Sequence, residues 1–327
     1  MIPHRAFLIA LAGLSTSSLA QERPVHTYSI VARDPETGEL GVAVQSHWFS
    51  VGSLVPWAEA GVGAVATQSF VDPAYGPLGL ELMRAGKSAR QALDALLASD
   101  PSRDVRQVAF VDAKGNVAAF TGSNCIPAAG HIEGEQFSVQ ANLMLNDKVW
   151  PAMAKAYRDT RGDLADHLLA ALDAAQTAGG DIRGKQSAAI LIVRGKSTSR
   201  PWADRIVDLR VEDHPEPLKE LRRLVQLRRA YRHMDDGDLA MEHKDVERGL
   251  KSYGTAMQLN PENPEMKYWT AVSMANASRL DDALPLFKSV FAADPNWKEL
   301  TPRLRKVDLL KVSDKDLERI LSATPAK

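Results

Sequence analysis

The sequence predicts an α+β domain with antiparallel strands, followed by a smaller all-α region. Between residues 27 and 212, strand-like runs of apolar and β-branched residues alternate with amphipathic segments rich in alanine and leucine, a pattern typical of sheets covered by helices. Short turns join several neighbouring runs, which favours antiparallel pairing. From residue 213 to 327 charged helical segments replace the strand-like runs. His214-Pro215-Glu216-Pro217 marks the boundary, because a residue before proline disfavours a continuing helix.

The first predicted element is a β-hairpin. Alternating apolar residues over 27–33 and 40–47 flank the turn Asp34-Pro35-Glu36-Thr37-Gly38-Glu39. Proline, glycine and aspartate at such positions are typical of a chain reversal. A third buried strand is expected over residues 61–68, and Tyr75-Gly76 is interpreted as a turn.

The remaining elements of the domain continue the same alternation. Helices are expected where apolar residues recur every three or four positions, and strands where apolar residues alternate or run together. The predicted helices cover residues 78–84, 89–97, 150–158 and 164–178, and the predicted strands cover 107–112, 116–122, 137–143, 187–193 and 205–211. Gly179-Gly180 is expected to end the last of these helices, since glycine readily adopts the left-handed conformation of a helix cap.

The first twenty residues have the features of a secretory signal peptide. His4 and Arg5 form a polar start, residues 6–14 are apolar, and Ser18-Leu19-Ala20 suits signal peptidase. The apolar run is too short to span a bilayer. The mature chain is therefore expected to begin at Gln21, with residues 21–26 as a leader, and to be periplasmic or secreted.

The amino-acid composition narrows the classes of function that this protein can have. The chain has 40 basic and 41 acidic residues and a net charge of −1, so nothing favours nucleic acid or an anionic membrane as a partner. Cys125 is the single cysteine, which excludes an intramolecular disulfide and favours a buried small residue over a reactive thiol. The histidines lack the spacing of a metal site, and no phosphate-binding loop or nucleophile elbow is present. No metal and no cofactor are expected.

The C-terminal region contains an imperfect internal repeat. Leu259-Asn260-Pro261 recurs as Ala293-Asp294-Pro295, a period of 34 residues, and small and aromatic residues recur upstream of each proline. This is the pattern of tetratricopeptide repeats, of which at least three are normally needed for independent stability. A helix over residues 218–232 is expected to attach the repeats to the first domain. The region is interpreted as a docking or self-association module, with a peptide-binding groove as the alternative.

Thr27 stands at the start of the first predicted strand, where a terminal nucleophile could lie. A threonine hydroxyl is a weak nucleophile until a base takes its proton, and the α-amine of a terminal threonine can be that base. Such an amine has a pKa of roughly 7.7–8.0, so a substantial part is neutral at working pH. The residues alone leave a second interpretation open, in which Thr27 simply begins a strand, as β-branched residues commonly do.

Four blocks in order resemble the DUF1028 family, a group within the N-terminal-nucleophile (Ntn) hydrolase superfamily. They are residues 27–44, residues 61–68, Gly76-Pro77-Leu78-Gly79 and residues 179–189. The resemblance covers residues 27–212. It implies a four-layer αββα sandwich with two central antiparallel sheets and, by superfamily analogy, hydrolysis of an amide bond.

The resemblance also suggests roles for individual residues. Ser187 matches a serine that supports the terminal amine of Thr27 from a later strand. Asn142 could supply an oxyanion-hole amide, and its alternative role is to end a strand. Asp181 and Arg183 could form an ion pair that lines the cleft and binds a substrate carboxylate, or a surface salt bridge at the end of a helix.

The second predicted strand differs in sequence from the proteasome-type members of that superfamily. Gln45, Ser46 and His47 stand where proteasome-type members have Asp-Ser-Arg, and they are expected to contact substrate. There is no lysine between Gln21 and Lys87, so lysine-assisted catalysis is not expected. The α-amine of the nucleophile would have to act as the base unaided.

Two functions follow from these observations. The first is an exported amidohydrolase that cleaves a small amide or peptide-like substrate, with Thr27 as nucleophile after a second cleavage between His26 and Thr27. The second is a non-catalytic periplasmic binding or assembly protein that retains the fold and uses its tetratricopeptide-like helices for protein interaction.

Overall fold

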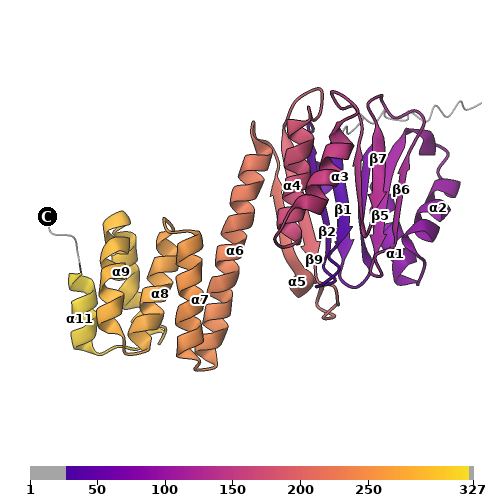
Figure 1. Cartoon of the computed structure of the whole chain (residues 1–327). Helices are drawn as coiled ribbons and strands as arrows, with labels where there is room; N and C mark the ends of the chain where they lie inside the picture. The colour runs from indigo at the N-terminus through magenta and orange to yellow at the C-terminus, as the bar shows by residue number, and fades with distance from the viewer. Residues whose placement is uncertain (1–26, 324–327) are drawn as a thin grey trace, which may run out of the picture.

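Two antiparallel β-sheets form the first part of the computed structural model, which describes residues 27–323 (Figure 1). The larger sheet has the strand order β10-β9-β2-β1-β8-β7, and the smaller has the order β3-β4-β5-β6. The strands of the larger sheet are β1 (Thr27–Arg33), β2 (Leu40–Ser46), β7 (Gly130–Gly134), β8 (Phe137–Ala141), β9 (Ser187–Val193) and β10 (Arg205–Val211). Those of the smaller are β3 (Pro56–Glu59), β4 (Gly63–Ser69), β5 (Arg106–Asp112) and β6 (Val117–Thr121).

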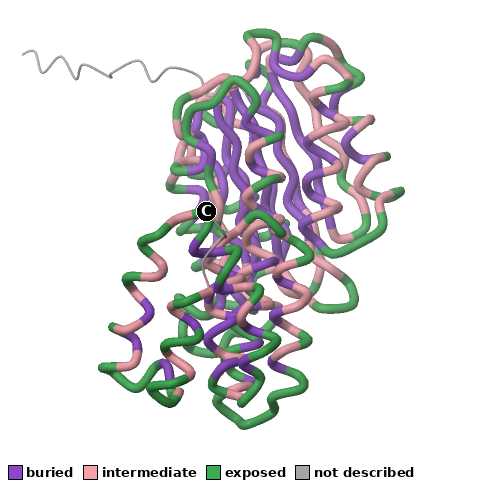
Figure 2. The backbone as a smooth tube through the Cα atoms, turned by 90° about the vertical axis from the view of Figure 1, so that its left-hand side faces the viewer, coloured by how far each residue is buried: buried purple, intermediate pink, exposed green. Residues whose placement is uncertain are grey.

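The opening hairpin lies at the centre of the larger sheet. Its register pairs Thr27 with Ser46 and Arg33 with Leu40, and β8 pairs with the other edge of β1. Because side chains alternate across a strand, Ile30 packs beneath helices while Val31 faces the smaller sheet. Figure 2 shows buried backbone concentrated in these strands.

Helices cover the outer faces of both sheets (Figure 1). The larger sheet is covered by α3 (Val149–Asp159) and α4 (Leu164–Thr177), and the smaller by α1 (Tyr75–Arg84) and α2 (Ala89–Ser99). Short elements complete the domain: η1 (Val51–Ser53), η2 (Arg103–Val105) and α5 (Pro201–Asp204). Ser88 and Asp163 begin α2 and α4 with capping boxes, in which each side chain satisfies backbone donors of the first turn. Apolar layers thus lie between the sheets and under each pair of helices.

The C-terminal region is entirely helical. It consists of α6 (Pro217–Glu242), α7 (Val246–Leu259), α8 (Pro264–Asn276), α9 (Leu280–Ala293), α10 (Asn296–Lys306) and α11 (Asp314–Ser322). The first half of α6 contributes Leu218, Leu221 and Val225 to the core beneath the larger sheet. Its second half packs against α7 through Ala230 and Met234. This single helix therefore connects the two parts of the molecule (Figure 1). Within residues 27–323, no helix combines the length and apolar character needed to cross a membrane.

The structure confirms an α/β domain with antiparallel sheets and a helical C-terminal region, and it corrects several element predictions. Strands β3 and β7 were not predicted, because each is an edge strand with few buried residues and so lacks a clear apolar pattern. Helix α6 continues well past residue 232, because no proline follows Pro217 within it and its second half packs against α7. The predicted turn at Tyr75-Gly76 is wrong, because both residues begin α1.

Two glycines explain how α1 approaches the smaller sheet so closely. A Cβ atom at Gly76 would lie 2.3 Å from the Trp57 ring, and one at Gly79 would lie 2.5 Å from the Phe110 ring. Neither distance is compatible with an ordinary contact. The sequence Gly76-Pro77-Leu78-Gly79 is therefore a packing motif of the helix.

We expect Gly79→Ala to destabilise the protein by about 1–3 kcal/mol, because the added methyl group overpacks a full interior. Gly254→Ala is the matched control, since a Cβ there meets nothing within 4 Å on helix α7. It should stabilise by up to ~1 kcal/mol through helix propensity. Urea unfolding followed by circular dichroism measures both changes, and a Gly79→Ala variant as stable as the wild type would contradict the packing argument.

Candidate functional site

Candidate residues from four chain segments meet at one end of the larger sheet. Ser46, at the end of β2, pairs with Thr27 on one side and with Ser187 on the other. Asn142 directly follows β8, and its backbone N–H donates to the Thr27 carbonyl oxygen at 3.1 Å. Thr27, Ser46, Asn142 and Ser187 are all fully buried. The strand register therefore brings together residues that are far apart in the sequence.

The pleat of the sheet decides which side chains share a surface. Thr27 and Ser46 lie on the face that looks toward the smaller sheet. Apolar residues at every second position along the same strands, such as Val31 and Val44, pack against that sheet. Gln45 lies on the opposite face, where its side-chain amide accepts from the Tyr28 hydroxyl. Gln45 therefore does not share a face with Thr27, because a one-residue step along a strand reverses the side chain. Its expected contact with substrate stays a prediction.

Tyr28 and Gln45 instead belong to the layer under α4. The Tyr28 hydroxyl also lies 3.0 Å from Oε1 of Gln176 on that helix. Burial, reinforced by the charges of Asp181 and Asp173, raises the pKa of Tyr28 well above its ordinary value, so the phenol keeps its proton. Gln45 Nε2 has no hydrogen-bond partner among the described residues. This cluster supports β1 and β2 from behind.

Ser187 anchors the segment that follows β2. Its hydroxyl donates to the Trp48 carbonyl oxygen and accepts from the Val51 N–H at 3.1 Å. Strand β2 lies between Ser187 and Thr27, and two strand spacings amount to roughly 10 Å. Ser46 therefore occupies the position next to Thr27, and the expected support of the Thr27 amine by Ser187 stays a prediction.

Asp181 and Arg183 form an ion pair that closes this end of the sheet. The Asp181 carboxylate is fully buried and accepts from Arg183 Nη2 at 2.7 Å and Nε at 3.0 Å, while the Arg183 side chain stays 28% exposed. The same carboxylate accepts from the His47 backbone N–H at 3.1 Å. The Nδ1 atom of His47 is buried and has no hydrogen-bond partner among the described residues. Residues 179–184 are thus tied to the end of β2.

A row of buried amides behind Thr27 was not predicted as part of the site. Gln68 on β4 and Gln107 on β5 face Ser29 and Gln140 across the interior between the sheets, and all four are fully buried. Ser29 Oγ donates to Gln68 Oε1 at 2.6 Å, and Gln140 Nε2 donates to Ser29 Oγ at 2.6 Å. The signal available in the sequence was a polar residue inside each of several otherwise apolar strands.

An exposed apolar rim lies beside the buried site. Met144 and Asp181 form an isolated antiparallel bridge and are buried, so the neighbouring positions Leu145 and Ile182 face outward and are more than half exposed. Leu143 adopts a left-handed backbone conformation with φ 55°, which is uncommon for a residue with a side chain. The chain therefore turns sharply just after Asn142.

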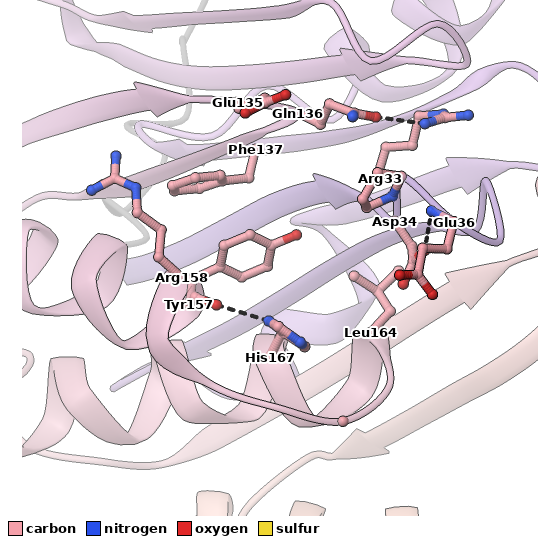
Figure 3. A pocket seen from close by; sticks show the side chains of 12 residues that line it. Arg33, Asp34, Glu36, Glu135, Gln136, Phe137, Tyr157, Arg158, Leu164 and His167 are labelled. Carbon is pink, nitrogen blue, oxygen red and sulfur yellow. Dashed lines mark hydrogen bonds between the residues drawn. The ribbon is translucent and has the colours of Figure 1, made fainter.

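A separate cavity of about 460 Å³ opens at the opposite end of β1 (Figure 3). Tyr157 stacks on Phe137 with ring centroids 4.4 Å apart, and Arg158 lies 5.2 Å above the same ring. His167 Nδ1 contacts the Tyr157 carbonyl oxygen at 2.8 Å. None of the predicted site residues lines this cavity, which lies roughly 20 Å from Thr27 along the strand.

Cys125 is buried, burial raises the pKa of its thiol, and Sγ contacts the Arg106 carbonyl oxygen at 3.3 Å. No group of three or more His, Cys, Asp or Glu residues in this range is arranged to hold a metal ion.

The two-sheet domain, which begins at the buried Thr27, belongs to a known family of proteins. The profile of the family of unknown function DUF1028 matches residues 27–221. The chain is therefore a member of the DUF1028 family. A crystal structure of a family member, protein SPO2555 from Silicibacter pomeroyi, is similar at 33% sequence identity and a TM-score of 0.56. The similarity covers 62% of this chain and 85% of that one. No curated protein matches the sequence.

We expect Asp181→Ala to destabilise the protein by about 2–4 kcal/mol, because buried donors from His47 and Arg183 lose their acceptor. Asp159→Ala is the control, since Asp159 is 59% exposed in its pair with Lys155 and such pairs contribute less than about 0.5 kcal/mol. Urea unfolding compares the two, and amide hydrogen exchange at His47 should quicken only in Asp181→Ala. Equal losses in both variants would contradict this account.

Proposed function

We propose that this protein is an exported Ntn-type amide hydrolase in which Thr27 is the nucleophile. The layers of helices, sheet, sheet and helices support assignment to that superfamily. The observation that carries the proposal is the position of Thr27. It is the first residue of a central strand, its side chain lies on the face between the sheets, and its carbonyl oxygen accepts from Asn142.

The chemistry requires only Thr27 and a donor for the oxyanion. Thr27 Oγ attacks the carbonyl carbon of the substrate amide while its proton passes to the Thr27 α-amine. The C–N bond then breaks, the proton moves to the departing nitrogen, and the acyl group remains on Oγ as an ester. Water hydrolyses the ester to a carboxylic acid and restores the hydroxyl.

Asn142 is the side chain best positioned to stabilise the oxyanion. It is buried immediately beside the Thr27 carbonyl, and its Nδ2 atom is oriented by a 2.9 Å hydrogen bond to Gln107 Oε1. Preorganised donors of this kind act at the point where negative charge develops, and each typically contributes about 10²–10³ in rate.

Thr27 must first be released from the preceding residues. The expected signal-peptide and leader residues, 1–26, lie outside the described residues. We propose that the Thr27 hydroxyl attacks the His26 carbonyl, that the acyl group shifts from nitrogen to oxygen, and that water hydrolyses the resulting ester. The α-amine is then available as a base. Thr27 has no exposed surface in this structure, and we propose that the same cleavage also opens the site to substrate.

The apolar rim favours a substrate with an apolar group next to the scissile amide. Leu145 and Ile182 expose large side chains beside Asn142 and Asp181, and Phe49 follows β2 at the same end. The nearby Arg183 guanidinium is already paired with Asp181. We therefore place aliphatic and aromatic acyl amides ahead of acidic ones as substrates.

A second candidate function, protein binding without catalysis, is favoured by the helical region. Gly237 packs against the Tyr253 ring, and the equivalent pair one repeat later, Ala271 and Phe287, is buried in one cluster, which supports a tetratricopeptide-like arrangement. A cavity of about 440 Å³ lies on α6 and α8, and its lining contains no basic side chain. The lining includes the apolar side chains of Met234, Trp269 and Leu309 and the carboxylates of Asp235, Asp238 and Glu265.

We expect the exported protein to hydrolyse members of a panel of aminoacyl and N-acyl p-nitroanilides. Thr27→Ala should abolish turnover because it removes the attacking oxygen. Thr27→Ser should retain part of it, because serine keeps both the hydroxyl and the amine. Undiminished turnover by Thr27→Ala would eliminate this mechanism. No turnover by the wild type, with a panel that also includes dipeptides and lactams, would favour the binding function.

A further inference from the structure

Two glutamines of the smaller sheet reach across the interior to the proposed nucleophile and oxyanion donor. Gln68 Nε2 donates to the Thr27 carbonyl oxygen at 3.2 Å and to Gln107 Oε1 at 2.7 Å. Gln107 Oε1 also accepts from Asn142 Nδ2 at 2.9 Å. A continuous chain of hydrogen bonds therefore joins Thr27, Gln68, Gln107 and Asn142.

The orientation of the Gln107 amide is fixed by its other end. Gln107 Nε2 donates to the Ala141 carbonyl oxygen and to Thr121 Oγ1, both at 2.9 Å. Turning the amide over would place its oxygen against that carbonyl oxygen and its nitrogen against the Asn142 Nδ2 donor. Gln107 must therefore present oxygen to Asn142, and Asn142 must present Nδ2 to Gln107.

The Thr27 peptide plane is held in the same way. Its carbonyl oxygen accepts from Gln68 Nε2 on the smaller sheet and from the N–H of Asn142, which directly follows β8. Two donors from different strands restrict rotation about the bond between Cα and the carbonyl carbon. Since that Cα carries the α-amine and the Cβ atom that bears the hydroxyl, its orientation decides where both groups point.

We propose that Gln68 and Gln107 are positioning residues for the reaction of Thr27, a role that rests on the proposed amide hydrolysis. Gln68 holds the Thr27 backbone from the interior, and Gln107 holds the Asn142 amide with its nitrogen as the donor. The pair thereby fixes the nucleophile and the oxyanion donor relative to each other. Neither glutamine touches the substrate or transfers a proton.

Gln140 offers a comparison within the same row of buried amides. It is as fully buried as Gln68 and Gln107, and its side chain makes comparable bonds, donating to Ser29 Oγ at 2.6 Å and accepting from Ser138 Oγ at 3.1 Å. It bonds to Ser29 Oγ, which in turn donates to Gln68 Oε1, whereas Gln68 Nε2 donates directly to the Thr27 carbonyl oxygen. If the glutamines acted only by joining the sheets, all three replacements should lower kcat alike.

The experiment compares Gln68→Met, Gln107→Met and Gln140→Met in the exported full chain, since methionine preserves side-chain length and volume. Turnover of the best p-nitroanilide is measured per molecule that begins at Thr27, as counted by intact mass, and thermal unfolding checks that each variant is folded. We expect similar losses of stability in all three. We expect kcat to fall about 10- to 100-fold in Gln68→Met and Gln107→Met with KM unchanged, and to fall clearly less in Gln140→Met.

The outcomes separate this inference from the proposed function. Wild-type kcat in a folded Gln68→Met or Gln107→Met variant, or an equal fall in Gln140→Met, would overturn the positioning role and leave Thr27 as nucleophile. A wild type as inactive as Thr27→Ala would overturn both proposals. Because Gln68 acts on Thr27 and Gln107 on Asn142, either variant that folds suffices for the comparison.

Discussion

The register of the opening hairpin is the constraint on which the rest of the site depends. The turn is fixed by hydrogen bonds from the Asp34 N–H to Glu39 and from the Gly38 N–H to Asp34, with Gly38 at φ 74°, a conformation that favours glycine. A slip of one residue would turn every side chain of β1 to the other face. The turn therefore determines that Thr27, some 20 Å away along the strand, faces the interior between the sheets.

The layer between the sheets changes character along its length. At the hairpin turn it is apolar, with Val31, Leu40 and Val42 packed together. At the other end, buried hydroxyls and amides replace the apolar side chains. Burying such groups is unfavourable unless they are hydrogen-bonded, and here the glutamines bond to one another and to Ser29. Among the described residues, the polar part of this layer lies at the Thr27 end, where we propose that the reaction takes place.

Much of this arrangement could be predicted from local patterns, and the part that could not depends on contacts between distant segments. Strong apolar periodicity predicted the hairpin and strands β9 and β10, whereas edge strands β3 and β7 carry little of it. Thr27, Ser46 and Asn142 were expected at the site and do meet. Gln45 lies on the opposite face because its face depends on the register, and strand order places β2 between Ser187 and Thr27. Gln68 and Gln107 were missed, since only the packing of one sheet on the other brings them to Thr27.

The central claim is that Thr27 becomes the first residue of the working protein. The most direct measurement is the intact mass of the purified exported chain together with N-terminal sequencing. The account predicts a single species that begins at Thr27, with the hydroxyl and α-amine on the same residue. A stable species that begins at Gln21 would leave the Thr27 nitrogen in a peptide bond, where it cannot act as a base, and would contradict the account.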